Sequence, residues 1–292
     1  MWSGRAERKR GLAPCTDGLL NMPRIAATSD LHFDANGQLT APAKVRAVLD
    51  AMVASGADAI IVAGDIGHPL ANYCQCLDLF AGCRIPVGVV AGNHDVWRDQ
   101  DHDSQRLLEE VLPIVSRQRG CRWLEQDRIV IGSTAIVGSM VWYDYSGAES
   151  LGLEPSYFAD AKPRISNDAL WVDWVWSDPE AAGMLRMGLR ATLEDLERDD
   201  SIRRVVVVTH VPVFEGQMLR NPDNFAWSVA NAYFGNLRTG RVIARFPKVR
   251  VVISGHLHTS RTTTVSRTPM ADIHAIVVGS DYGDPDWVLV DV

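Results

Sequence analysis

Short apolar runs rich in β-branched residues alternate with stretches of helical periodicity in the first part of the chain. The apolar runs at residues 24–28, 59–62 and 86–90 are separated by helical patterns at residues 42–55 and 69–81. Because this alternation is typical of parallel crossover units, it predicts an α/β fold. In such a fold the C-terminal ends of the strands meet at one edge of the sheet, where polar side chains that follow the strands converge.

The rest of the chain carries similar apolar runs with longer connections. Helical patterns occupy residues 101–117, 179–198 and 228–238, and Gly240 is expected to end the last helix. No internal repeat or linker interrupts the sequence, which predicts one domain across residues 22–292. We expect two short strands within residues 128–140 and further strands at residues 205–210, 249–253, 261–265, 274–278 and 286–290.

An aromatic-rich segment at residues 142–178 lacks a sustained period and predicts an insertion into this domain. Within it, the Trp-Tyr-Asp-Tyr stretch at residues 142–145 forms either a stacking wall for a substrate or an edge of the core. Residues 1–21 lack the apolar region of a signal peptide, so we expect a flexible N-terminal tail. Met22 directly precedes the first strand and is an alternative start of translation.

Short polar clusters follow five of the predicted strands. An Asp-x-His pair at a strand exit places two side chains on the same side of the extended backbone, where both can bind one ion. The glycines that precede Asp65 and Asn93 allow tight turns. The clusters are Asp30-Leu31-His32, Gly64-Asp65, Gly92-Asn93-His94-Asp95, Thr209-His210 and Gly255-His256-Leu257-His258.

The potential metal ligands in these clusters are four histidines, two aspartates and one asparagine: His32, His210, His256, His258, Asp30, Asp65 and Asn93. A mixed set of nitrogen and oxygen donors without a thiolate suits manganese, iron, zinc or cobalt better than calcium or magnesium. Each cluster alone is typical of an ordinary turn. The prediction of a metal centre therefore depends on the combination of the clusters in this order.

In this combination the chain resembles the calcineurin-like metallophosphoesterases, a family with the motifs D-x-H, GD, GNH-[DE], a lone His and G-H-x-H. The resemblance extends over roughly residues 24–290. It implies a four-layer α/β/β/α sandwich of two mixed β-sheets flanked by helices. It also implies a site for two divalent metal ions, which lie about 3.5–4 Å apart in such centres.

The resemblance also implies a role for each polar residue. His94 is the proton donor or the stabiliser of the transition state. Asp95 accepts a hydrogen bond from the His94 ring, unless it only caps the following turn. The implied ligand sets are Asp30, His32 and His258 for the first ion and Asn93, His210 and His256 for the second, with Asp65 as the bridge.

The expected mechanism follows from charge and metal chemistry. Two divalent ions held by only two carboxylates and a bridging hydroxide keep a net positive charge, which attracts a phosphate group. Metal coordination lowers the pKa of bound water to about 7, so the hydroxide is available for in-line attack on phosphorus near neutral pH. We therefore expect a dinuclear metal-dependent phosphoesterase that hydrolyses small, nucleotide-like phosphodiesters or phosphomonoesters.

Composition narrows the expected partners and location. A formal net charge of −7 over 292 residues argues against a broad electrostatic footprint for DNA or an anionic membrane. No apolar run approaches the roughly 20 residues that a membrane span needs. Five cysteines without a C-x-x-C pair fit a reducing compartment. We expect a cytoplasmic enzyme with a small-molecule phosphoester substrate and no membrane partner.

Three other functions stay open at the level of sequence. A protein phosphatase is one, although the chain has no evident extension for binding a peptide. A nuclease would share the metal chemistry, although the chain has no basic run for gripping a duplex. A non-catalytic scaffold would retain the fold, although all seven ligand positions and His94 carry the residues that catalysis needs. The sequence does not indicate the native metal or the oligomeric state.

Overall fold

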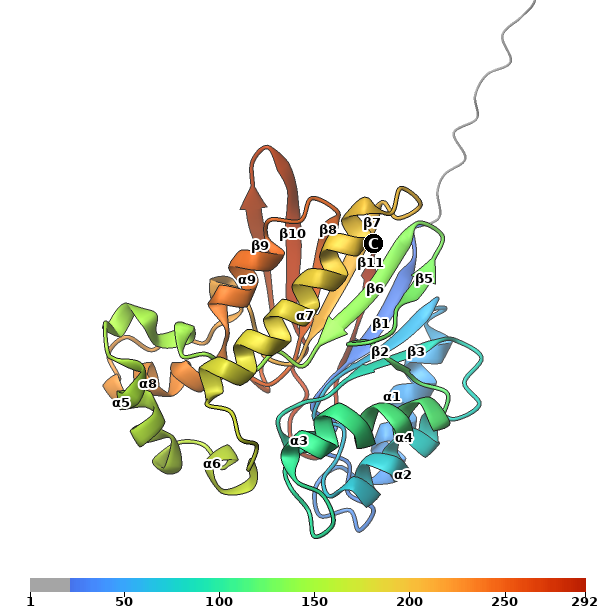
Figure 1. The fold of residues 1–292 in the computed structure, drawn as a ribbon. Coiled ribbons are helices and arrows are strands. Elements are labelled where there is room, and N and C mark those ends of the chain that lie inside the picture. Colours follow the sequence, from blue (N-terminus) through green and yellow to red (C-terminus); the bar gives the residue numbers. More distant parts are fainter. Residues whose placement is uncertain (1–21) are drawn as a thin grey trace, which may run out of the picture.

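Two β-sheets packed face to face carry the strands that the apolar runs predict (Figure 1). The computed structural model describes residues 22–292, so the tail predicted at residues 1–21 lies outside the described residues. Strands β1 to β4 run parallel, and β11 pairs antiparallel with β1. The first sheet has the order β11 (Trp287–Asp291), β1 (Arg24–Thr28), β2 (Ala59–Ala63), β3 (Val87–Val90) and β4 (Arg122–Trp123).

The second sheet is also mixed. Its four inner strands run parallel, and β5 and β9 pair antiparallel at its two edges. The strand order is β5 (Ile129–Ile131), β6 (Thr134–Ser139), β7 (Arg204–Thr209), β8 (Val249–Ser254), β10 (Met270–Val277) and β9 (Arg261–Arg267).

Successive side chains of the central strands face opposite layers, because the side-chain direction alternates along a strand. Ile25 and Ala27 of β1 share an apolar core between the sheets with Val206 and Val208 of β7. Ala26, which lies between the first two, belongs to the core under the helices on the outer face. The result is the four-layer α/β/β/α sandwich, and the expected fold class is confirmed.

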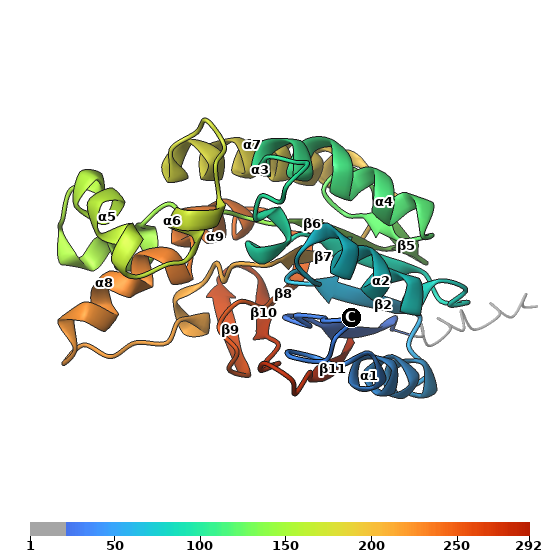
Figure 2. The same ribbon diagram turned by 90° about the horizontal axis from the view of Figure 1, so that it is seen from below.

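Helices cover the outer faces, and in Figure 2 α1 and α7 lie on opposite sides of the stacked sheets. None of the helices within residues 22–292 combines the length and the apolar composition needed to cross a bilayer. The first sheet packs against α1 (Pro42–Ala54), α2 (Leu70–Phe80) and α4 (Leu112–Gln118), and the second against α7 (Asp178–Arg198) and α9 (Leu237–Ile243). A π-helical turn at Leu107–Val111 joins the short α3 (Ser104–Arg106) to α4.

The prediction of a single helix at residues 228–238 is wrong. The structure has two helices, α8 (Phe225–Phe234) and α9, and Gly235 adopts an extended conformation between them. Asn236 then caps α9, because its side-chain oxygen accepts a hydrogen bond from the backbone N–H of Thr239 at 2.8 Å. Gly240 lies inside α9 and does not end it; a Cβ at this position would overlap the carbonyl oxygen of Val213. A packing constraint therefore explains this glycine.

The aromatic-rich segment folds into short helices beside α8, beyond one end of the sheets (Figure 1). Trp142, Tyr143 and Tyr145 are buried, so they form an edge of the core and not an exposed stacking wall. The phenolic hydroxyl of Tyr233 on α8 donates a hydrogen bond to the carbonyl oxygen of Phe158 at 2.5 Å. The helices are Ser146–Leu151, α5 (Pro155–Ala161), Lys162–Arg164 and α6 (Asp168–Trp171).

Candidate metal centre

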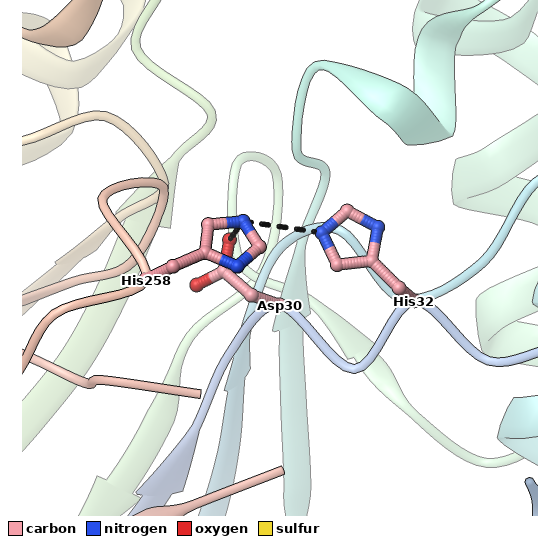
Figure 3. Close-up of side chains that lie close together, drawn as sticks. All are labelled: Asp30, His32 and His258. Atoms are coloured by element: carbon pink, nitrogen blue, oxygen red, sulfur yellow. Dashed lines mark hydrogen bonds and ion pairs between the residues drawn. The ribbon is translucent and has the colours of Figure 1, made fainter. Parts of the chain in front are cut away.

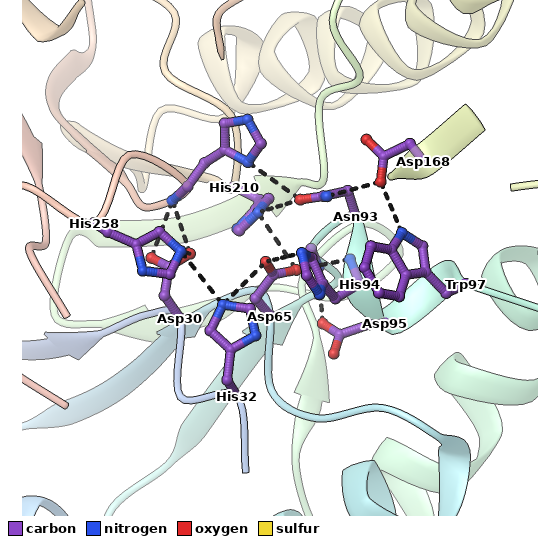
Figure 4. A network of polar contacts seen from close by, with 12 residues as sticks. Asp30, His32, Asp65, Asn93, His94, Asp95, Trp97, Asp168, His210 and His258 are labelled. Carbon is purple, nitrogen blue, oxygen red and sulfur yellow. Dashed lines mark hydrogen bonds and ion pairs between the residues drawn. The ribbon is translucent and has the colours of Figure 1, made fainter. Parts of the chain in front are cut away.

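All seven residues predicted as metal ligands meet where the strands end (Figure 4). Each comes from the turn that follows a parallel strand, as the sequence pattern predicts. Neighbouring ligand atoms lie 3.0 to 3.7 Å apart, so the cluster is continuous. Asp30 and His32 follow β1, Asp65 follows β2, Asn93 follows β3, His210 follows β7, and His256 and His258 follow β8.

One group of ligands consists of Asp30, His32 and His258 (Figure 3). The Nε2 atoms of the two histidines lie 3.4 Å apart, and Nε2 of His258 lies 3.7 Å from Oδ1 of Asp30. Tyr282 packs beside both histidine rings, with ring centroids 4.5 Å and 4.7 Å away. The three donor atoms thus converge on a position that one ion could occupy.

A second group consists of Asn93, His210 and His256. The side-chain oxygen of Asn93 lies 3.0 Å from Nε2 of His210 and 3.1 Å from Nδ1 of His256. The other ring nitrogen of His210 contacts the carbonyl oxygen of Ala63 at 2.9 Å. That of His256 contacts the carbonyl oxygen of Tyr233 at 3.0 Å. Each histidine is therefore oriented by backbone through one nitrogen, while the other faces the cluster.

Asp65 lies between the two groups, and its two carboxylate oxygens face different partners. Oδ1 lies 3.5 Å from Nε2 of His210, while Oδ2 lies 3.6 Å from Nε2 of His32. Oδ1 also accepts a hydrogen bond from the backbone N–H of His94 at 2.9 Å. The carboxylate is almost fully buried. This placement is what a ligand shared by two ions requires.

Five of the seven predicted ligands hold a left-handed backbone conformation that non-glycine residues rarely adopt. Such conformations cost of order 1–3 kcal/mol each and persist only where the surrounding structure enforces them. Their φ angles lie between 40° and 73°, in Asp30, His32, Asp65, His256 and His258. The strain is concentrated at the ligands because a sharp turn immediately after each strand directs the side chain into the cluster.

Burial sets the protonation of the histidines. It lowers the pKa of His32 to about 3 and that of His256 to about 4, so both rings are neutral and keep a lone pair for a metal. Burial alone would also lower the pKa of His210, but the charge of Asp65 raises it to about 10. The negative charge that holds a proton on His210 also attracts a cation. The donor set therefore fits a transition metal.

His94 occupies the open side of the cluster. Its ring stacks on that of Trp97, with centroids 3.8 Å apart, and meets the ring of His32 edge-on at 4.7 Å. Nε2 of His94 lies 3.9 Å from Oδ2 of Asp65. Its side chain keeps 21% of its surface exposed, as does that of His258, whereas His32 is exposed by only 3%. A bound substrate can therefore reach this imidazole.

The hydrogen bond expected between the His94 ring and Asp95 is not found. The Asp95 carboxylate accepts three backbone N–H groups instead, from Ile66 at 2.8 Å, Gly67 at 3.0 Å and Gly92 at 2.8 Å. These contacts tie the turn after β2 to the turn after β3. Asp95 therefore holds the ligand-bearing turns together, which is closer to the capping alternative than to a partner of the His94 imidazole.

Sequence reasoning missed Asp168, a buried carboxylate on α6 that reaches the cluster (Figure 4). Its Oδ1 accepts hydrogen bonds from Nδ2 of Asn93 at 2.9 Å and from Nε1 of Trp97 at 2.7 Å. Its Oδ2 accepts one from the hydroxyl of Tyr143 at 3.0 Å. The residue follows no strand and belongs to no motif, so only its position in the aromatic-rich segment could have drawn attention to it.

A groove of about 800 Å³ lies beyond the Trp97 side of the centre. Its lining includes His68, Leu70 and Trp171. The rings of His68 and Trp171 lie 5.6 Å and 6.0 Å from that of Trp97, which stacks on His94. A row of rings thus connects the groove with the metal ligands.

Comparisons with known proteins agree with this geometry. The model of the calcineurin-like phosphoesterase family matches residues 23–260. One relative, the [acyl-carrier-protein] phosphodiesterase PptH of Mycobacterium tuberculosis (strain ATCC 25618 / H37Rv), is 26% identical over 264 residues, which cover 82% of this chain and 74% of that protein.

Two solved structures share the fold. The phosphopantetheinyl hydrolase PptH from Mycobacterium tuberculosis superposes with a TM-score of 0.66 and 23% identity, over 92% of this chain and 96% of that one. A dimetal phosphatase from Danio rerio gives a TM-score of 0.55 and 14% identity, over 93% of each chain. At these identities the structures establish the architecture alone.

The approach of Gly92 to Asp65 generates a prediction. A Cβ at position 92 would overlap both Oδ1 and the backbone nitrogen of Asp65, so Gly92→Ala must displace this carboxylate. We expect the affinity for Mn²⁺ to fall at least tenfold and the free energy of unfolding to drop by roughly 1–3 kcal/mol. Calorimetric Mn²⁺ titration and urea unfolding measure the two effects.

Gly188→Ala is the matched control, because a Cβ at this position on α7 meets nothing within 4 Å. This variant should keep its Mn²⁺ affinity and gain roughly 0.5–1 kcal/mol of stability, since alanine is the better helix former. Unchanged Mn²⁺ binding in Gly92→Ala would show that Asp65 tolerates displacement and is not a ligand.

Proposed function

Because the chain belongs to the calcineurin-like phosphoesterase family and is a metal-dependent phosphoester hydrolase, we propose that it prefers phosphodiesters, one arm of which is a phosphopantetheine-like chain. The position of Asp65, whose two oxygens face the two ligand groups, supports hydrolysis at a two-metal centre, and the groove beyond Trp97 is the observation that carries the choice of a long arm. The relative described as an [acyl-carrier-protein] phosphodiesterase supports the choice of a diester.

The proposed ligand sets follow the two groups. Asp65 would contribute to both groups, and among the described residues the carboxylates of Asp30 and Asp65 would be the only charged ligands. When bound, the two ions would supply Lewis acidity to the phosphoryl oxygens and lower the pKa of water to about 7. Asp30, His32 and His258 would hold the first ion, and Asn93, His210 and His256 the second.

His94 is the proposed proton donor to the oxygen of the departing alcohol. The side chain is partly exposed, and its ring plane is fixed by stacking on Trp97 at 3.8 Å. Nε2 lies close to the ligand cluster, 3.9 Å from Asp65, without being needed to complete either ligand group. A proton on this nitrogen can therefore reach a leaving oxygen bound beside the ions.

The groove beyond Trp97 is the proposed site for the long arm of the substrate. An arm bonded to the oxygen that His94 protonates would extend along Trp97 towards His68 and Trp171. A phosphopantetheine arm is long and carries amides, which suits a groove that has one apolar wall, formed by Pro69, Leu70, Ala71 and Trp171, and one polar wall at residues 98–102.

A cytoplasmic location is part of the same proposal. The four cysteines within the described residues, Cys74, Cys76, Cys83 and Cys121, are all free thiols, which supports a reducing compartment. Cys15 lies outside the described residues.

Substrate preference tests the proposal directly. Protein stripped by a chelator and reloaded with Mn²⁺ is expected to hydrolyse an aryl phosphodiester with a kcat/KM at least about tenfold above that for the matching aryl phosphomonoester. Two divalent ions with two carboxylates and a hydroxide would leave one net positive charge, which matches the single negative charge of a diester better than the two charges of a monoester. Protein without added metal should be inactive on both substrates. A preference for the monoester, or for a cyclic nucleotide over every pantetheine-like diester, would contradict the proposed substrate.

Replacement of His94 tests the proton donor. His94→Asn should lower kcat/KM for a diester with a poor leaving group by about 10²–10⁴, the usual contribution of general acid catalysis. The bound Mn²⁺, measured by elemental analysis, should stay the same because neither ligand group depends on His94. The control is His274→Asn, which changes an exposed histidine on β10 and should leave activity intact. Full activity in His94→Asn would refute its role.

Replacement of Trp171 tests the groove. Trp171→Ala should raise KM for a phosphopantetheine diester roughly 2- to 12-fold, because an aromatic contact contributes about 0.5–1.5 kcal/mol. The kcat/KM for a small aryl diester, which does not reach the groove, should change less than about twofold. Leu170→Ala is the control, because Leu170 is also exposed on α6 but is not part of the lining. Equal losses on both substrates would place the arm elsewhere.

A further inference from the structure

Asp168 is a buried carboxylate that contacts the proposed metal ligand Asn93 and also Trp97, the ring on which His94 stacks (Figure 4). Only 2% of its surface is exposed. Its three donors are Nδ2 of Asn93, Nε1 of Trp97 and the hydroxyl of Tyr143, at 2.9, 2.7 and 3.0 Å. An ionised carboxylate removed from water is costly unless such donors compensate it, so this arrangement is built around its charge.

We propose that Asp168 is a positioning residue, which turns the oxygen of the Asn93 amide towards the second ion and holds Trp97 against His94. The inference rests on the proposed metal centre and adds a residue to it. The aromatic-rich segment at residues 142–178 contains none of the family motifs. Through Asp168 it would nevertheless contribute a residue to the metal centre.

The chemistry of the amide explains why Asn93 needs this partner. An asparagine side chain has an oxygen that can bind a metal and an NH₂ group that cannot, and the two ends have nearly the same shape. The Asp168 carboxylate can only accept hydrogen bonds, so it selects the orientation with Nδ2 towards itself. Oδ1 then faces His210 and His256, at 3.0 and 3.1 Å. If the Asn93 amide were reversed, its oxygen would face the oxygen of Asp168. Its NH₂ group, which cannot bind a metal, would then face His210 and His256.

The same oxygen of Asp168 also fixes the indole of Trp97. Its bond to Nε1 sets the plane of the ring on which His94 stacks at 3.8 Å. Asp168 therefore constrains a metal ligand and the support of the proposed proton donor at once. Tyr143, whose ring is fully buried, holds the second oxygen and prevents the carboxylate from turning away.

Asp178 provides a matched comparison within the same molecule. It is also buried and also accepts a Trp N–H and a Tyr O–H, from Trp142 and Tyr145, each at 2.7 Å. Its third donor is Nζ of Lys162 at 2.6 Å, so it contacts none of the proposed metal ligands. A carboxylate that only anchors the aromatic segment should behave like Asp178, whereas a positioning residue should not.

The test is calorimetric titration of Mn²⁺ into chelator-stripped protein. Asp168→Ala should weaken one of the two binding steps about 10- to 100-fold, the usual effect of losing a residue that orients a ligand, and leave the other within about twofold. Asp178→Ala should leave both steps unchanged. Asp168→Asn should recover most of the loss, because its side-chain oxygen can still accept the hydrogen bond from Asn93.

The outcomes separate this inference from the proposed function. Equal affinities in the wild type and in Asp168→Ala, or equal losses in Asp168→Ala and Asp178→Ala, would overturn it even in an active enzyme. An Asp168→Asn variant as impaired as Asp168→Ala would also overturn it. A wild type that binds two ions but hydrolyses no phosphodiester would refute the proposed function alone, and a wild type that binds fewer than two would refute both.

Discussion

The buried carboxylate of Asp65 is the constraint on which the rest of the molecule depends. An ionised group in the interior costs several kcal/mol unless positive charge or donors surround it. Here the compensation comes from His210 after β7, at 3.5 Å, and from the backbone N–H of His94 after β3, at 2.9 Å. Each of these strands must therefore end at the same level of the sandwich. The two sheets cannot slide against each other without leaving this charge uncompensated.

The strands, the α/β class and the convergence of the ligands could be predicted because they depend on local patterns, whereas the four-layer arrangement was implied by the resemblance to the family. Apolar runs define the strands, and a cluster such as Asp30-Leu31-His32 lies directly after its strand. The break at Gly235 and the role of Asp95 could not be predicted, because both are decided by contacts with other segments. Asp168 illustrates the limit, since 75 positions separate it from Asn93 and no periodicity connects them.

The centre combines a rigid part with an adaptable part. The ligands are held by strained turns after the strands, and glycines leave no room for displacement around Asp65. The aromatic segment, in contrast, contacts the ligands through side-chain hydrogen bonds from short helices. The segment can thus vary in shape only where Asp168 keeps its contacts with Asn93 and Trp97. Changes elsewhere in the segment would alter the surroundings of the centre without touching a ligand, which lets one architecture serve different phosphoesters.

The pairing of β11 with β1 has a consequence for biosynthesis. β1 carries the first two ligands and is flanked by β2 on one side and β11 on the other, and the hydrogen bond from Thr28 to Asp286 spans 258 positions. At a translation rate of roughly 5–20 residues per second, one flank of β1 stays open on the ribosome for about ten to fifty seconds. An open strand edge is a template for mispairing. The nascent chain therefore needs this edge of β1 to be protected until β11 has been synthesised.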